Sequence, residues 1–218
     1  MDYKKIYDKD YFSGKKSFFY KIGGYDRFGN GLVFHRLPRP LLKYIKEKGG
    51  GRVLDVGCAY GFLLERFPGT FEKFGIDASE YAIGIAQKRL PEADLRIWGA
   101  EDSLPFAENF FDIIVCNDVL EHLEYPEKAL ENIYKALKKD GIFYAATPNL
   151  NFLRKFFLKY ADNKERHISM FSRKSLKSLL EREGFTIIES WTFGGFFLPF
   201  FKFKSDLGTD MVFICRKG

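Results

Sequence analysis

The fold of this chain is decided by the stretch Val53-Leu54-Asp55-Val56-Gly57-Cys58-Ala59-Tyr60-Gly61. Residues 53–56 are a short apolar run typical of a buried strand, and the segment from residue 61 to 67 is typical of the start of a helix. Gly57 and Gly61 allow a tight turn and a close approach of the backbone to a ligand, which a Cβ atom would obstruct. Because parallel sheets bind ligands at the carboxyl ends of their strands, this loop is the first candidate binding site.

Short apolar runs alternate with amphipathic segments over the rest of the chain. They predict strands at 53–56, 74–77, 95–98, 111–116, 142–147, 185–191 and 211–216. Helices are predicted at 40–48, 80–89, 126–137 and 173–183, with Ser79 and Ser172 as N-caps of the second and fourth. Continuous apolar strands separated by helices imply a mostly parallel sheet covered on both faces.

The length of 218 residues fits one α/β domain with a small extension. We expect an N-terminal lid and helix over 1–48 and the main domain over 49–218. Within that domain, insertions near 150–170 and 192–208 are expected to shape an acceptor site. The net charge of +6 fits a lysine-rich surface, and an acidic partner such as nucleic acid or an anionic membrane is the alternative.

The three cysteines and three histidines are scattered, so no zinc-binding spacing is present and no metal site is expected. Isolated cysteines fit a reducing compartment. The charged N-terminus is followed by no apolar run, and no stretch approaches the roughly 20 apolar residues of a membrane span. These features together predict a cytoplasmic protein.

The glycine loop fits neither of the common nucleotide fingerprints. A dinucleotide site needs glycines where this chain has Gly57, Ala59 and Phe62, and no Gly-Lys-Ser/Thr follows for a triphosphate site. A carboxylate at Asp55 would repel a pyrophosphate but attract an ammonium group. Asp77 ends the second strand, where a carboxylate can accept hydrogen bonds from ribose hydroxyls. The pattern therefore favours a cationic, ribose-bearing ligand such as S-adenosylmethionine.

These motifs resemble the class I S-adenosylmethionine-dependent methyltransferases, in the branch that includes the ubiquinone-biosynthesis O-methyltransferases. The resemblance is strong over residues 50–150 and loose over 170–216. It rests on residues 53–61 together with Gly75-Ile76-Asp77-Ala78-Ser79, Leu104-Pro105-Phe106, Phe111-Asp112-Ile113-Ile114-Val115-Cys116, Leu120-Glu121-His122-Leu123, Thr147-Pro148-Asn149 and Leu179-Leu180-Glu181-Arg182-Glu183-Gly184-Phe185. It implies a three-layer Rossmann-like fold with a mostly parallel seven-stranded sheet and an antiparallel last strand.

The resemblance also implies roles for individual residues. Gly57 and its neighbours Cys58 and Gly61 would pack on the methionine moiety, with Asp55 nearby and the Asn117 backbone at the amino end. Asp77 would bind the ribose, and adenine would lie over Ala78 near the loop 99–103. The chain departs from the family at two alanines. Ala59 replaces the middle glycine, and Ala100 stands where an acid contacts adenine, so Glu101 or Asp102 is the substitute.

The methyl acceptor is less defined by the sequence. His122 is the best candidate for a general base, with ordering of its loop as the alternative, whereas His167 and His35 are weaker candidates. Tyr11-Phe12 and residues 23–25 resemble segments that fold over the cofactor in relatives, or they pack on the sheet edge. The aromatic segments 152–160 and 193–204 could complete the core, line an apolar acceptor pocket, contact a membrane or stack on RNA.

We therefore predict a methyltransferase acting on oxygen or nitrogen of a small, apolar or lipid-like acceptor. Two alternatives stay open at this point. One is a cofactor-binding protein without transferase activity, and the other is an RNA methyltransferase.

Overall fold

The computed structural model describes residues 3–21, 24–28, 39–194, 198–203 and 205–218. One eight-stranded sheet forms its centre, in the order β3-β2-β1-β4-β5-β8-β6-β7. The strands are β1 (Gly51–Val56), β2 (Phe71–Asp77), β3 (Asp94–Ile97), β4 (Phe111–Asn117), β5 (Leu137–Pro148), β6 (Phe185–Gly194), β7 (Leu198–Phe203) and β8 (Asp210–Lys217).

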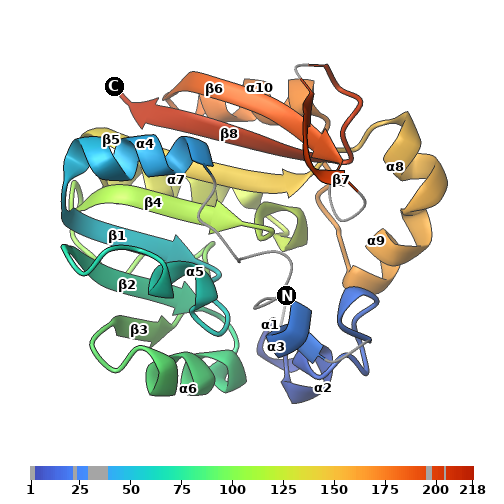
Figure 1. Ribbon diagram of the computed structural model, residues 1–218, viewed down its shortest axis with the longest axis horizontal. Helices are drawn as coiled ribbons and strands as arrows, with labels where there is room; N and C mark the ends of the chain where they lie inside the picture. The colour runs from blue at the N-terminus through green and yellow to red at the C-terminus, as the bar shows by residue number, and fades with distance from the viewer. Residues whose placement is uncertain (1–2, 22–23, 29–38, 195–197, 204) are drawn as a thin grey trace.

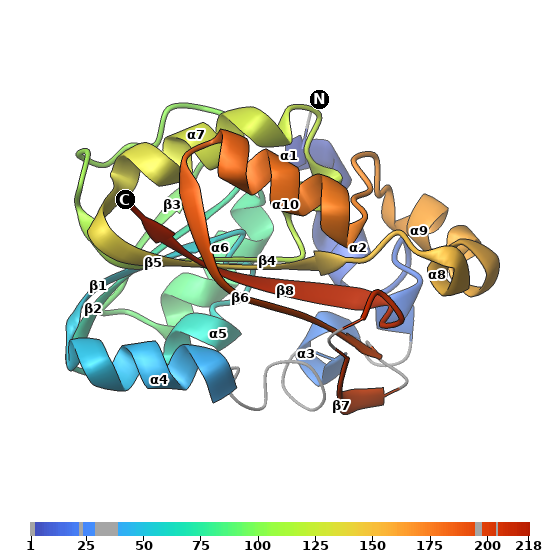
Figure 2. The ribbon, with the colours of Figure 1, turned by 90° about the horizontal axis from the view of Figure 1, so that it is seen from above.

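Helices cover both faces of this sheet, as predicted (Figure 1, Figure 2). On one face lie α7 (Pro126–Ala136) and α10 (Arg173–Arg182), and on the other lie α4 (Arg39–Lys48), α5 (Phe62–Glu65) and α6 (Glu80–Arg89). Successive residues of a strand point to opposite faces, so Val53 packs in the core under α4 and α6 and Leu54 in the core under α7 and α10. The three-layer α/β architecture is thus confirmed.

The strand directions agree with the prediction. β1, β2, β3, β4 and β5 are mutually parallel, and the last strand β8 runs antiparallel between β5 and β6. The number of strands was predicted one too low, because β7 joins the edge of the sheet antiparallel to β6. Pro199 suits this edge position, where a strand needs no donor on its outer side.

The remaining helices lie beside the carboxyl ends of the parallel strands (Figure 1). They are α1 (Tyr3–Ile6), α2 (Lys9–Phe12), η1 (Phe19–Lys21), α3 (Gly24–Phe28), η3 (Leu120–His122), α8 (Phe152–Phe157) and α9 (Lys159–Glu165). The N-terminal helices and α9 therefore surround the edge of the sheet where the sequence predicts the ligand. Among the described residues, no helix is both long and apolar enough to cross a membrane.

Candidate active site

A cavity opens at the carboxyl ends of β1, β2 and β4, where the order of the strands reverses. This switch point is the usual ligand site of an open α/β sheet. Six of the nine predicted cofactor residues line the cavity, namely Asp55, Gly57, Cys58, Asp77, Ala78 and Asn117. The structure thus brings together residues from three strand ends that are far apart in the sequence.

The glycine loop needs left-handed backbone at three of its residues. Gly57 has a φ of 76°, and a Cβ atom placed on it would lie 2.2 Å from Cγ2 of Val119. Gly61 has a φ of 78° and is the N-cap of α5, where it turns the chain into the helix. It does not line the cavity. Ala59 has a φ of 45°, which costs an L-residue free energy that glycine would not lose.

Asp77 holds the loop in this conformation. Its Oδ2 accepts a hydrogen bond from the Ala59 amide at 2.9 Å, and its Oδ1 accepts one from the Ser79 amide at 2.8 Å. Burial raises the pKa of Asp77, while the two N–H donors act in the opposite direction. Ser79 separately caps α6, as predicted, through the amide of Ala82. Each Asp77 oxygen keeps a second lone pair, so the carboxylate can organise the loop and still accept from a ligand.

Asp55 adds a second carboxylate to the same wall. Only 3% of this residue is exposed, and it lies at the end of β1. Burial raises the pKa of Asp55 well above its usual range, and the neighbouring Asp77 charge adds to the effect. A cationic ligand between the two carboxylates would offset this repulsion, because an opposite charge nearby favours the ionised form.

The expected adenine contacts need a correction. Glu101 and Asp102 do not line the cavity. The Glu101 carboxylate instead accepts hydrogen bonds from the Tyr3 hydroxyl at 2.8 Å and from the Tyr125 amide, and Asp102 is exposed to solvent. This end of the cavity is lined instead by Trp98, Gly99 and Ala100.

Aromatic rings from the N-terminal segment, residues 3–25, close the other side of the cavity, and we call them the aromatic cover. These rings belong to Tyr3, Tyr7, Tyr11, Phe12, Tyr20 and Tyr25. Tyr11, Phe12 and Tyr25 form a small buried core with Tyr60 and Phe62 of the glycine loop and α5. Tyr11, Phe12 and Tyr25 were predicted from the sequence to cover the cofactor, whereas Tyr3, Tyr7 and Tyr20 were not. Tyr3, Tyr7 and Tyr11 recur every four residues, but the chain bends between α1 and α2, so the spacing alone does not place their side chains together.

Glu165 at the end of α9 fastens this N-terminal segment. Its carboxylate accepts hydrogen bonds from the Tyr11 hydroxyl at 2.9 Å, the Ser17 hydroxyl at 2.7 Å and the Phe19 amide at 3.1 Å. The residue is 3% exposed. One buried carboxylate therefore connects the aromatic cover to the far side of the site.

Replacing Glu165 with alanine is expected to loosen this cover. Loss of a charged acceptor leaves buried donors unpaired and costs about 1–3 kcal/mol, so tryptic cleavage at Lys15 and Lys16 should accelerate about 10- to 100-fold. Mass spectrometry of timed digests measures that rate. Glu72→Ala, which removes a carboxylate 66% exposed in its side chain, is the matched control and should cleave as the unmodified protein does. Equal rates for Glu165→Ala would contradict the fastening role.

His122 lies at the end of η3 and lines the cavity. Burial and the neighbouring His167 lower the pKa of His122 to about 3, so its imidazole is neutral at physiological pH. Its ring packs edge-on against Tyr7 and His167, with centroids 5.5 Å and 4.8 Å away. Sequence alone did not pair His122 with His167. The third histidine, His35, lies outside the described residues.

The described aromatic residues of α8 and α9 do not form the acceptor pocket. Phe152, Phe156, Phe157 and Tyr160 are 68–78% exposed and do not line the cavity. They therefore do not complete the core either. No described residue of 192–208 lines the cavity, and the side chains of 195–202 lie outside the described set. Contact of the exposed rings with a membrane stays a prediction.

Comparison with known proteins identifies the family. The profile described as "Methyltransferase domain" matches residues 25–190. The ubiquinone biosynthesis O-methyltransferase of Azoarcus sp. (strain BH72) is 35% identical over 108 residues, which are 47% of this chain and 46% of that protein. The enzyme of the same name from Actinobacillus pleuropneumoniae is 30% identical over 138 residues, covering 57% and 59%. The chain thus spans about half the length of these relatives.

Solved structures share the fold. A methyltransferase from Clostridium acetobutylicum superposes with a TM-score of 0.69 at 12% identity, covering 89% of this chain and 96% of its own. One from Thermotoga maritima gives 0.61 at 23% identity, covering 88% and 95%. The chain belongs to the methyltransferase domain family, a family of class I S-adenosylmethionine-dependent enzymes.

S-adenosylmethionine is the cofactor that this membership implies, and the cavity fits it. The wall at the strand ends carries two carboxylates for a cationic, ribose-bearing molecule. Gly57, which has no side chain, lines the cavity beside them.

Proposed function

We propose that this protein transfers the methyl group of S-adenosylmethionine to a small acceptor enclosed beneath the N-terminal aromatic cover. The observation that carries the proposal is the cavity itself. It joins Asp55, Gly57 and Asp77 on the donor side to tyrosine rings on the other side. When bound, the cofactor supplies an activated methyl carbon, so the protein mainly aligns donor and acceptor and excludes water.

Individual residues have distinct roles in this proposal. Asp77 binds the ribose hydroxyls and Ala78 supports the adenine, while the backbone at Asn117 holds the methionine amino end. Asp55 and the loop from Gly57 to Gly61 surround the methionine moiety. The N-terminal lid over 1–48 and the main domain over 49–218 then act together, because the lid rings line the cavity that the domain forms.

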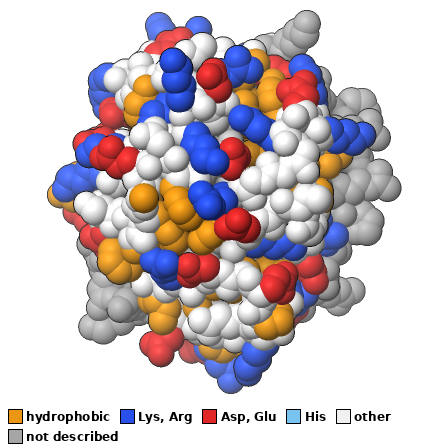
Figure 3. Space-filling model, turned by 90° about the vertical axis from the view of Figure 1, so that its left-hand side faces the viewer, with side chains coloured by type: hydrophobic (Ala, Val, Ile, Leu, Met, Phe, Trp, Pro, Cys, Tyr) orange, Lys and Arg blue, Asp and Glu red, His pale blue; other side chains and the backbone are white. Residues whose placement is uncertain are grey.

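The acceptor is proposed to be a small hydroxylated molecule with apolar character. Aromatic rings dominate the cover of the cavity, which favours an apolar or aromatic acceptor body. The curated relatives are named as O-methyltransferases, which supports oxygen over nitrogen. The acceptor space lies beneath the aromatic rings that line the cavity, which disfavours a large nucleic acid. On the opposite side of the molecule, at the amino ends of the parallel strands, Figure 3 shows basic and acidic side chains mixed, so the described residues of that face offer no basic patch.

Calorimetric titration with S-adenosylhomocysteine and methyl-transfer assays test the proposal together. We expect micromolar binding of S-adenosylhomocysteine, and transfer of a labelled methyl group to phenolic acceptors rather than to RNA. Binding without transfer to any acceptor would favour a regulatory cofactor-binding protein. Absence of binding at millimolar concentration would overturn the proposal.

A further inference from the structure

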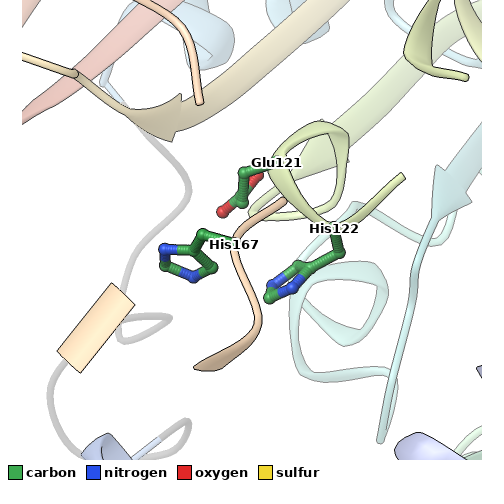
Figure 4. A group of neighbouring side chains, drawn as sticks. All are labelled: Glu121, His122 and His167. Atoms are coloured by element: carbon green, nitrogen blue, oxygen red, sulfur yellow. The ribbon is translucent and has the colours of Figure 1, made fainter. Parts of the chain in front are cut away.

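Three potential metal ligands meet beside the cavity. Glu121 and His122 are neighbours on η3, and His167 lies in the segment that connects α9 to α10. One ligand atom from each residue lies within 4.8 Å of the others. Figure 4 shows the Glu121 carboxylate and the His122 ring, which both come from η3, on either side of the segment that carries His167. The backbone fixes this approach, because the amides of Ile168 and Ser169 both donate to the Glu121 carbonyl oxygen at 2.9 Å.

Two atoms of this group are buried without a hydrogen-bond partner among the described residues. They are Oε1 of Glu121 and Nδ1 of His122, and Glu121 is only 1% exposed. An unpaired buried polar atom costs about 1–3 kcal/mol, and native proteins rarely leave such atoms unpaired. Both atoms belong to residues of the potential metal-ligand group, and one cation bound to both would satisfy them together.

Other polar atoms of Glu121 and His167 make hydrogen bonds of the kind that orient metal ligands in known metal sites. The Thr147 hydroxyl donates to Oε2 of Glu121 at 2.8 Å and leaves Oε1 free. Nδ1 of His167 lies 2.8 Å from Oδ1 of Asp162, whose carboxylate also binds Arg154. A carboxylate acceptor at Nδ1 favours the tautomer with its lone pair on Nε2, which is the arrangement of metal-ligating histidines.

We propose that Glu121, His122 and His167 bind a divalent transition-metal ion of the zinc class. Two imidazoles and one carboxylate are an established ligand set for such ions, and three protein ligands leave a fourth position open. With bonds of about 2.1 Å in tetrahedral geometry, ligand atoms lie about 3.4 Å apart, so side chains whose ligand atoms now lie within 4.8 Å must close by up to about 1.4 Å on binding the ion. His122 therefore acts as a ligand rather than as the general base.

The open position gives the metal a role in catalysis, which rests on the proposed function. His122 also lines the cavity, so the ion lies at its edge, where an acceptor hydroxyl can bind it. As a Lewis acid the ion favours loss of the hydroxyl proton to water. The oxygen lone pair then forms the new C–O bond while the C–S bond breaks and its electrons remain on sulfur. The site thus selects hydroxylated acceptors.

Cobalt and zinc titrations of the tag-free protein test this inference without using activity. We expect one Co²⁺ per chain with visible d–d absorption, and displacement by Zn²⁺ measured against a chromophoric chelator. His122→Ala, His167→Ala and Glu121→Gln should each weaken Zn²⁺ binding at least about 100-fold, and Asp162→Asn about 10-fold. Glu108→Gln, which changes an exposed carboxylate, is the control and should bind Zn²⁺ normally.

Circular dichroism and S-adenosylhomocysteine binding verify that each variant is folded. Stoichiometric Zn²⁺ binding that these substitutions abolish supports the site. Absence of Zn²⁺ binding at millimolar concentration, or equal affinity in all variants, overturns it. The proposed function fails separately, because it requires S-adenosylhomocysteine binding and the metal site does not.

Discussion

Gly57→Ala is expected to weaken S-adenosylhomocysteine binding about 10- to 100-fold and to lower the melting temperature. The left-handed φ of 76° costs an L-residue about 1–2 kcal/mol. The new methyl group would also lie 2.2 Å from Cγ2 of Val119, and overpacking of this kind costs about 1–3 kcal/mol. Valine is stiff at χ1, so the loop must move instead, and the loop forms the cofactor wall.

Two further variants separate the causes of this effect. Gly57→Ala combined with Val119→Ala removes the clash but keeps the strained φ, so it should recover part of the affinity. Gly69→Ala is the matched control, because a Cβ there meets nothing within 4 Å and its φ is not positive. Calorimetry and thermal melts measure both quantities. Binding by Gly57→Ala within threefold of the unmodified protein would show that the loop tolerates a side chain.

The donor half of the site could be predicted from the sequence because its signals are local. Parallel strands buried on both faces appear as continuous apolar runs, so β1 and β4 were located within two residues of their bounds. Ser79 and Ser172 were found because N-caps use a short side chain at a fixed offset from the helix. Asp55, Gly57 and Asp77 lie at strand ends, which topology alone brings together.

The acceptor half could not be predicted, because it depends on contacts between distant segments. The aromatic run at 193–204 has no alternation, so β7 was missed, and the rings of α8 that suggested a pocket are exposed. The approach of His167 to His122 depends on the hydrogen bonds that the amides of Ile168 and Ser169 donate to the Glu121 carbonyl oxygen. No spacing rule encodes those bonds, and scattered histidines therefore gave no metal signal.

Asp77→Asn is expected to weaken S-adenosylhomocysteine binding at least about 100-fold. Both carboxylate oxygens already accept backbone N–H groups, from Ala59 and Ser79, so an amide must turn its NH₂ group toward one of these donors. The variant also loses charged acceptors for two ribose hydroxyls. Hydrogen bonds to a charged group contribute about 1.5–3 kcal/mol each, so this second loss alone accounts for a 100-fold change.

An S-adenosylhomocysteine analogue that lacks both ribose hydroxyls distinguishes ribose binding from organisation of the loop. The unmodified protein should lose about 100-fold in affinity on going to the analogue, whereas Asp77→Asn should bind the two ligands almost equally, because the partner of the hydroxyls is gone. Asp102→Asn, at an exposed carboxylate outside the cavity, should behave as the unmodified protein. If Asp77→Asn still discriminated fully between the two ligands, another residue would bind the ribose and Asp77 would serve only to hold Ala59 and Ser79.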